Sequence, residues 1–223
     1  MQTRARTKRS PGRPVGGTNA DARDLLLTAA TELFAEQGIA ATTFALIAKR
    51  AGLTPAMVHY YFRDRDHLLD CVVEERLAAL IASVWDPVEA GMTPAETIAG
   101  VVDRLLKGIE GMPWIPSAWM REVLNEGGLL RTRVLRHIPF DKVRRLSEAI
   151  AQAQKKGAIN PGIDPVMIAF STIGLVMMHS ATAGFYAQTF HRKTPDREAL
   201  RRHIAGLLMH GLDAPAGGAK KQK

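Results

Sequence analysis

Apolar side chains recur at three- and four-residue steps along most of this chain, which is the periodicity of helices. In the first such segment, Leu26, Leu33 and Phe34 fall on one face. Gly38 follows at the place where a left-handed residue ends a helix. The sequence shows no clear strand alternation and no repeat. We therefore expect an all-α protein whose first helix begins near Thr18.

A glycine marks the corner between the next two predicted helices. Gly52 can adopt the positive φ of a tight turn, and Ala48 is small where the helices would cross. Thr54 suits an N-cap, and Pro55 suits the first helical position, where its missing N–H costs nothing. The apolar contacts between the helices would come from Ile47, Ala51, Leu53, Val58 and Phe62. The pattern predicts a helix-turn-helix, with an ordinary helical hairpin as the alternative.

The charge of the chain favours a polyanionic partner. Lys and Arg outnumber Asp and Glu by 30 to 22, which suits nucleic acid or an acidic membrane surface. Residues 1–17 carry five basic residues and no acid, and we interpret them as a flexible basic arm. Arg13 lies between Gly12 and Pro14, as in an AT-hook core, so it is a candidate for the DNA minor groove. The alternative is a solubilising tail.

Part of the chain, about residues 20–70, resembles the TetR family of bacterial regulators. The matching positions are Thr42, Thr43, Ile47, Ala48, residues 51–54 and residues 60–68. The resemblance implies a three-helix DNA-binding domain, the start of a fourth helix, and a variable helical domain that binds a small molecule and forms a homodimer. A long helix from Asp64 toward Trp85 would join the two domains.

The resemblance also implies which residues contact double-stranded DNA. They are Thr43, Thr54, Pro55, Ala56, Met57, His59, Tyr60, Tyr61 and Arg65. Thr43 and Arg65 resemble phosphate contacts, which position a protein without reading sequence. The second helix of the motif lacks Arg, Asn and Gln, which make bidentate base contacts. We therefore expect it to read thymine methyl groups and DNA shape.

The expected organisation has four segments. They are the arm at 1–17, the helix-turn-helix domain at 18–65, the effector-binding and dimerisation domain at 66–213, and a disordered tail at 214–223. The third segment contains no phosphate loop, HExxH or GxSxG motif, so we do not expect an enzyme. With one cysteine, Cys71, and scattered histidines, the chain predicts no disulfide, metal site or cofactor and fits a reducing cytoplasm.

Aromatic and methionine side chains in the larger domain are candidates for a pocket that takes an apolar or aromatic effector. They are Trp114, Trp119, Met120, Phe170, Met177, Met178, His179 and Phe185. Each suits a plain core as well. Arg121 and Glu122 could orient a polar end of the ligand, with a surface ion pair as the alternative.

Residues 165–188 contain no charged side chain and are long enough to span a bilayer. Polar interruptions, including His179 and Gln188, favour a helix buried in a core or a subunit interface, and we expect no membrane. Small residues in this helix would let a partner approach closely. The helices at about 142–156 and 165–190 are the candidates for the dimer interface.

These expectations combine into one functional hypothesis. The resemblance implies a dimeric transcriptional repressor that leaves a palindromic operator when a small molecule binds. The alternative is a regulator or architectural protein that binds DNA without an effector.

Overall fold

The computed structural model describes residues 19–86, 88–89 and 91–213, and every regular element in these ranges is helical. The expected all-α class is therefore confirmed. The N-terminal arm with Arg13, the predicted start at Thr18 and the tail at 214–223 lie outside the described residues. The helices are α1 (Asn19–Gln37), α2 (Phe44–Ala51), α3 (Pro55–Tyr61), α4 (Arg65–Val72), α5 (Ala78–Trp85), α6 (Pro94–Gly111), α7 (Ile115–Ala118), α8 (Arg131–Leu135), α9 (Phe140–Lys155), α10 (Met167–Thr189) and α11 (Arg197–Leu212).

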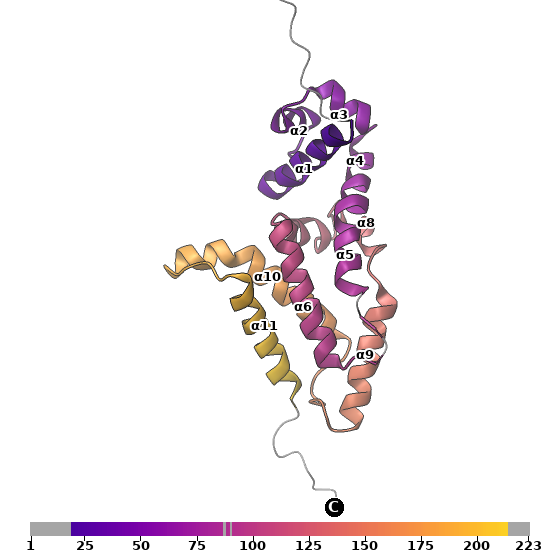
Figure 1. The fold of residues 1–223 in the computed structure, drawn as a ribbon, viewed down its shortest axis with the longest axis vertical. Coiled ribbons are helices and arrows are strands. Elements are labelled where there is room, and N and C mark those ends of the chain that lie inside the picture. Colours follow the sequence, from indigo (N-terminus) through magenta and orange to yellow (C-terminus); the bar gives the residue numbers. More distant parts are fainter. Residues whose placement is uncertain (1–18, 87, 90, 214–223) are drawn as a thin grey trace, which may run out of the picture.

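Helices α1, α2 and α3 form a compact group at one end of an elongated molecule (Figure 1). Phe34, Ile47, Val58 and Phe62 are buried between them. Gly38 ends α1 with φ +84°, in the left-handed region predicted for it. Because glycine has no Cβ, it adopts this backbone without strain.

The predicted connecting helix runs from this group along the body of the molecule (Figure 1). Asp64 is its N-cap, and the carboxylate accepts a hydrogen bond of 2.8 Å from the backbone N–H of His67. The helix continues through α4, a π-helical segment η1 (Val73–Leu77) and α5 to Trp85. A second π-helical segment, η2 (Trp119–Val123), follows α7. Such π-helical turns are rare and are frequently found at functional sites.

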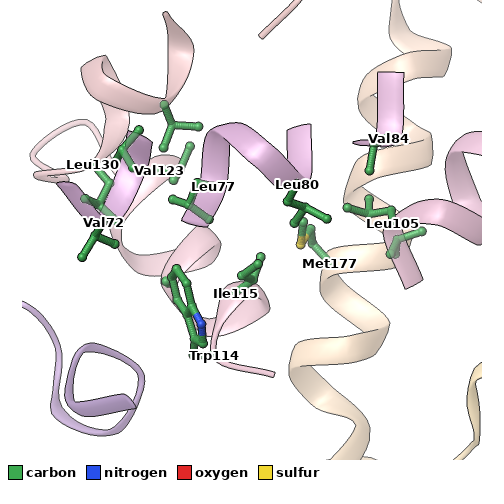
Figure 2. Packing of buried hydrophobic residues seen from close by; sticks show 14 of the residues in the cluster. Val72, Leu77, Leu80, Val84, Leu105, Trp114, Ile115, Val123, Leu130 and Met177 are labelled. Carbon is green, nitrogen blue, oxygen red and sulfur yellow. The ribbon is translucent and has the colours of Figure 1, made fainter. Parts of the chain in front are cut away.

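Helix α6 is the centre of the larger domain and contacts α5, α9, α10 and α11. Its side chains Ile98, Val102 and Leu105 are buried. The apolar core continues from this helix to the connecting helix, α7 and α10, as Leu80 and Met177 show in Figure 2. The two helices that the sequence placed at 142–156 and 165–190 correspond to α9 and α10.

The uncharged helix α10 is buried on one face only. Ile168, Thr172 and Val176 are buried, whereas Phe170 and Phe185 are exposed by 59% and 68%. Within the described residues, α10 is also long and apolar enough to cross a membrane, and 28% of its most apolar stretch is buried. The expected burial is therefore met on the face toward α6, and no described residue of this chain covers the opposite apolar face.

Candidate nucleic-acid interface and effector cavity

The first helix of the motif, α2, is fixed at both ends by its sequence. The Thr43 hydroxyl accepts a hydrogen bond of 3.3 Å from the backbone N–H of Leu46. At the other end Gly52 has φ +68°, and its N–H reaches the carbonyls of Ala48 and Lys49. The predicted turn geometry is confirmed. Thr43 remains exposed, so its hydroxyl can still donate a hydrogen bond outward.

The second helix, α3, presents most of the predicted DNA-contact residues to solvent. Val58 faces the core, whereas Pro55, Ala56 and His59 are exposed. Tyr60 is exposed by 74%. The remaining candidates on this helix, Met57 and Tyr61, are half-buried. The structure thus brings a mixed apolar and aromatic surface together at the end of the molecule.

Two helices of this chain begin with the same three residue types and differ in their caps. Thr93 starts α6 with a capping box, in which its hydroxyl accepts from the Glu96 N–H at 3.2 Å and its backbone N–H donates to the Glu96 carboxylate at 2.8 Å. Thr54 occupies the same position before Pro55 and Ala56, but its side chain makes no cap hydrogen bond. The predicted N-cap position is confirmed, and the predicted cap bond is absent. The exposed Thr54 hydroxyl is available to an external acceptor.

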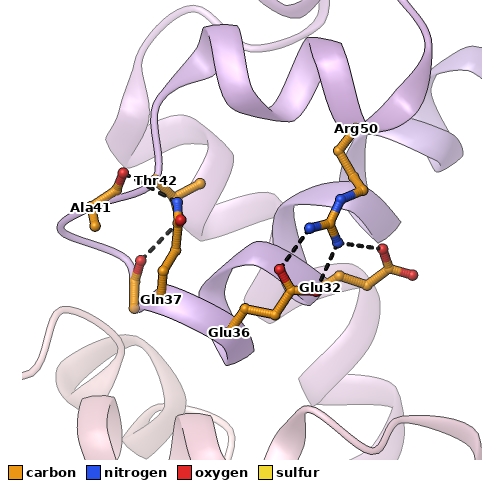
Figure 3. A network of polar contacts seen from close by, with 7 residues as sticks. Glu32, Glu36, Gln37, Ala41, Thr42 and Arg50 are labelled. Atoms are coloured by element: carbon orange, nitrogen blue, oxygen red, sulfur yellow. Dashed lines mark hydrogen bonds and ion pairs between the residues drawn. The ribbon is translucent and has the colours of Figure 1, made fainter.

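The arginines around the motif differ in how far they are engaged by the protein. Arg50 pairs with Glu32 at 3.2 Å and with Glu36 at 2.6 Å on α1, so its charge is compensated (Figure 3). Arg63 pairs with Asp64 at 2.9 Å. Arg65 is exposed and donates to the backbone carbonyl of Ile39, which places it beside the end of α1. Its guanidinium keeps further donors for a phosphate.

A small apolar cavity lies in the larger domain, between the connecting helix, α6, the α7–η2 segment and α10. Its volume is about 50 Å³. Among the candidates from the sequence, Trp114, Trp119 and Met177 line it. Trp85 lines it too, so all three tryptophans of the chain meet there. Each described residue of the wall has an apolar side chain.

Five of the eight predicted effector residues do not line this cavity. Phe170 lines a neighbouring groove, whereas Met120, Met178, His179 and Phe185 line neither space. The His179 ring lies at 2.7 Å from the Leu175 carbonyl and 5.2 Å from the His203 ring, on the side of α10 that meets α11. The sequence could not separate these residues from Met177, because an apolar helix without a polar face gives no sign of which side meets the cavity.

Arg121 makes a contact that the sequence did not reveal. It donates to the carbonyls of Phe34 and Ala35 in the last turn of α1, although it lies 86 residues away from Ala35. The proposed pair with Glu122 does not form, since the Glu122 carboxylate accepts from the Leu129 N–H at 3.2 Å. A cation at a helix C-terminus satisfies carbonyls that have no partner within the helix. The π-helical segment that lines the cavity therefore also holds α1.

The other π-helical segment holds the N-terminal half of α1. Arg23 of α1 pairs with Glu75 of η1, and this pair keeps the pKa of the Glu75 carboxyl below its usual value. In a second ion pair, the cation lies on η1 and the anion on α1, because Arg76 pairs with Asp24. Leu77, at the end of the same segment, lines the cavity. Both π-helical segments thus contact the cavity on one side and α1 on the other.

Cys71 lies next to the Arg23–Glu75 pair, with its Sγ 3.3 Å from the Arg23 guanidinium. Burial raises the pKa of this thiol, so it stays protonated at neutral pH. Among residues 19–86, 88–89 and 91–213, no group of three His, Cys, Asp or Glu side chains could hold a metal ion.

Comparisons with known proteins agree with this geometry. Residues 26–72 match the family model for bacterial regulatory proteins of the tetR family. The chain is 24% identical to the HTH-type transcriptional regulator UidR of Escherichia coli K12 over 193 residues, which cover 83% of this chain and 92% of UidR. It is 28% identical to the HTH-type transcriptional repressor KstR2 of Mycolicibacterium smegmatis over 91 residues, which cover 41% of this chain and 44% of KstR2.

A solved structure supports the fold over most of the chain. The transcriptional regulator FadR of Bacillus subtilis, in complex with stearoyl-CoA, superposes with a TM-score of 0.62 at 20% identity, covering 85% of this chain and 98% of FadR. The matched segment 26–72 contains the turn at Gly52 and the capped start of α3. Residues 26–72 therefore form a domain of the tetR family of bacterial regulatory proteins.

Proposed function

We propose that the protein is a homodimeric repressor that binds a palindromic operator and is released by a small apolar or aromatic effector. The observation that carries the proposal is the apolar cavity whose wall includes both π-helical segments that hold α1. A molecule entering the cavity would displace these segments, and the position of α2 and α3 would follow. The relative KstR2 is a transcriptional repressor, which supports repression rather than activation.

The proposed DNA contacts are those of the exposed end of the molecule. Thr43 and Arg65 would bind phosphates, which orient the protein on the duplex. Thr54, Pro55, Ala56 and Met57 would face the bases. His59, Tyr60 and Tyr61 would contact phosphates or base edges. The free hydroxyl of Thr54 supports this assignment, because the equivalent hydroxyl in α6 is used for a capping box.

The proposed dimer interface uses the part of the uncovered face of α10 around Met178 and Phe185, together with α11. Phe185 and Met178 are exposed on α10, and Leu207 is exposed by 54% on α11. Figure 1 shows that the end of α10 extends away from the body formed by α5, α6 and α9, whereas α11 returns alongside α6. An apolar face of this size in a water-soluble regulator is explained by a second copy of the chain. Two-fold symmetry would then present two α3 helices to half-sites about 34 Å apart.

Release is proposed to be a population shift. An effector that binds better to a conformation with displaced π-helical segments moves the equilibrium toward that conformation by its differential affinity. Arg121 and the Arg23–Glu75 pair carry the displacement to the two ends of α1. The structure of FadR in complex with stearoyl-CoA supports an effector with a large apolar part.

The second candidate is a cytoplasmic regulator that needs no effector. The small size of the cavity, about 50 Å³, favours it, since drug-sized ligands occupy roughly 300–1,000 Å³. A closed core of this kind would leave operator binding indifferent to small molecules.

One experiment separates the two candidates. DNA fragments bound by the protein are selected from the genome of its source, and a compound library is screened for release of the selected operator. The proposal expects a palindromic operator and at least one apolar compound that releases it. Operator binding that no compound alters would support the second candidate, and sedimentation of the free protein as a monomer would contradict the dimer.

A further inference from the structure

An apolar groove opens beside the cavity and shares part of its wall. Its volume is about 380 Å³, and it lies between η2, α8, α9 and the first turns of α10. The residues that line both spaces are Trp119, Val123, Ile138 and Ile173. Of these two spaces, only the groove reaches the volume of a ligand site, roughly 300–1,000 Å³. A molecule in it would press on the side chains that separate it from the cavity.

Several side chains of the groove are apolar and exposed. Leu124, Leu135, Phe140 and Phe170 have exposed fractions between 40% and 59%. Such apolar surface in contact with water is unfavourable, and a concentration of it marks a binding site. The occupant of the groove must therefore contribute apolar surface of its own.

One cation interrupts this apolar lining. Among the described residues of the wall, Arg131 is the single charged side chain. It is half-buried and donates to the Leu124 carbonyl at 3.1 Å, and it has no carboxylate partner in the described part of the chain. A purely apolar occupant would strip water from the guanidinium without replacing its hydrogen bonds. An occupant with an anionic group would replace them.

We propose that the groove binds an amphipathic molecule with one long hydrocarbon chain and an anionic head. The head pairs with Arg131, and the chain lies along the Trp119 wall toward the cavity, which carries no charge. This inference gives a chemical class to the proposed effector. The binding of the molecule is independent of the proposed function, whereas its effect on operator release rests on that function.

The tryptophans give a direct measurement of binding. Because all three line the cavity, a bromine atom on a bound hydrocarbon chain would quench the intrinsic fluorescence of the protein. The probes are ω-bromododecanoate and the neutral ω-bromododecanol, titrated at pH 7.5 below their aggregation limits. We expect the acid to bind at least about tenfold more tightly, since a charge-assisted hydrogen bond contributes 1.4 kcal/mol or more.

Two variants test the assignment to Arg131. Arg131→Gln should remove the preference for the acid and leave binding of the alcohol unchanged. Arg136→Gln is the matched control, because Arg136 is an exposed neighbour that does not line the groove. Equal binding of acid and alcohol by the unmodified protein would overturn the inference, as would equal effects of the two variants. The inference would also be overturned if neither probe quenched the fluorescence of a protein that sediments as a dimer. That result would assign the groove to a subunit contact.

Competition distinguishes the sources of the anionic head. Dodecanoate and dodecanoyl-CoA carry the same chain, and the one that displaces the brominated acid at lower concentration identifies the head. Failure of the proposed function can be distinguished from failure of this inference. If only the proposed function fails, the acid binds in an Arg131-dependent way but does not release the operator. Release by the alcohol as readily as by the acid would contradict the present inference and leave the proposed function intact.

Discussion

At the scale of single residues, the interface depends on a few backbone positions with strict requirements. Gly52 has φ +68°, and a Cβ added there would meet no atom within 4 Å. The cost of replacing it is therefore backbone strain rather than a steric clash. Thr54 also occupies its N-cap position through its backbone conformation, since its hydroxyl makes no cap hydrogen bond.

Gly52→Ala is expected to lower the free energy of unfolding by about 1–2 kcal/mol, because a Cβ is disfavoured in the left-handed region. Urea denaturation followed by circular dichroism measures the change. Gly111→Ala is the control, since Gly111 is exposed, has no positive φ and also has open space around it. A loss of stability in the control as large as in Gly52→Ala would show that strain at residue 52 is not the cause.

At the scale of elements, α1 is held at both ends by segments that contact the cavity. The Arg23–Glu75 pair holds its N-terminal half, and Arg121 holds its last turn. The contacts come from the two π-helical segments, η1 and η2, whose side chains Leu77 and Trp119 line the cavity. Helix α1 is therefore the element through which the larger domain positions α2 and α3.

The Glu75 contact predicts a pH dependence. Because the folded protein holds the pKa of Glu75 below its unfolded value of about 4.3, the pair stabilises the fold above that pH and loses this contribution as pH falls through the lower folded value. Glu75→Gln should lower stability at pH 6 by about 1 kcal/mol or less, since the pair is partly exposed.

The difference between Glu75→Gln and the unmodified protein should shrink as pH is lowered from 6 to values below about 4.3. Urea denaturation across this range measures it, with the exposed Glu126 replaced by Gln as the control. A difference that stays constant down to pH 3 would contradict the assigned role of the carboxylate.

Arg121 predicts a local effect on α1. Arg121→Ala should speed amide hydrogen exchange in the last turn of α1 by roughly fivefold, because losing a cation at a helix C-terminus costs up to about 1 kcal/mol. It should also weaken operator binding. Arg136→Ala is the control. Unchanged exchange in residues 34–38 would show that Arg121 does not hold this helix.

The sequence predicted local elements better than the contacts between them. The turn at Gly52 and the start of α3 follow from backbone rules within a few residues, and the structure has both. Arg121 could not be assigned, because its partners lie 86 and 87 residues away. On α10, hydrophobicity alone did not separate Met177, which lines the cavity, from its exposed neighbour Met178.

At the scale of the whole molecule, α3, which carries most of the proposed DNA contacts, lies far from α10 (Figure 1). The proposed repressor would act through the spacing of two α3 helices, which requires that α3 reads DNA. The chain itself offers a matched pair of sites for this question. Ala56 of α3 and Ala95 of α6 are both exposed and both follow a Thr–Pro helix start.

The most direct test is genomic selection of bound DNA by the unmodified protein, Ala56→Glu and Ala95→Glu. Glutamate in the first turn of a helix is compatible with folding, so Ala56→Glu places a negative charge at the proposed base-reading edge without disturbing α3. The account predicts that the unmodified protein and Ala95→Glu enrich the same palindromic sequence, and that Ala56→Glu loses it. Enrichment of that sequence by Ala56→Glu to the same degree would contradict DNA reading by α3.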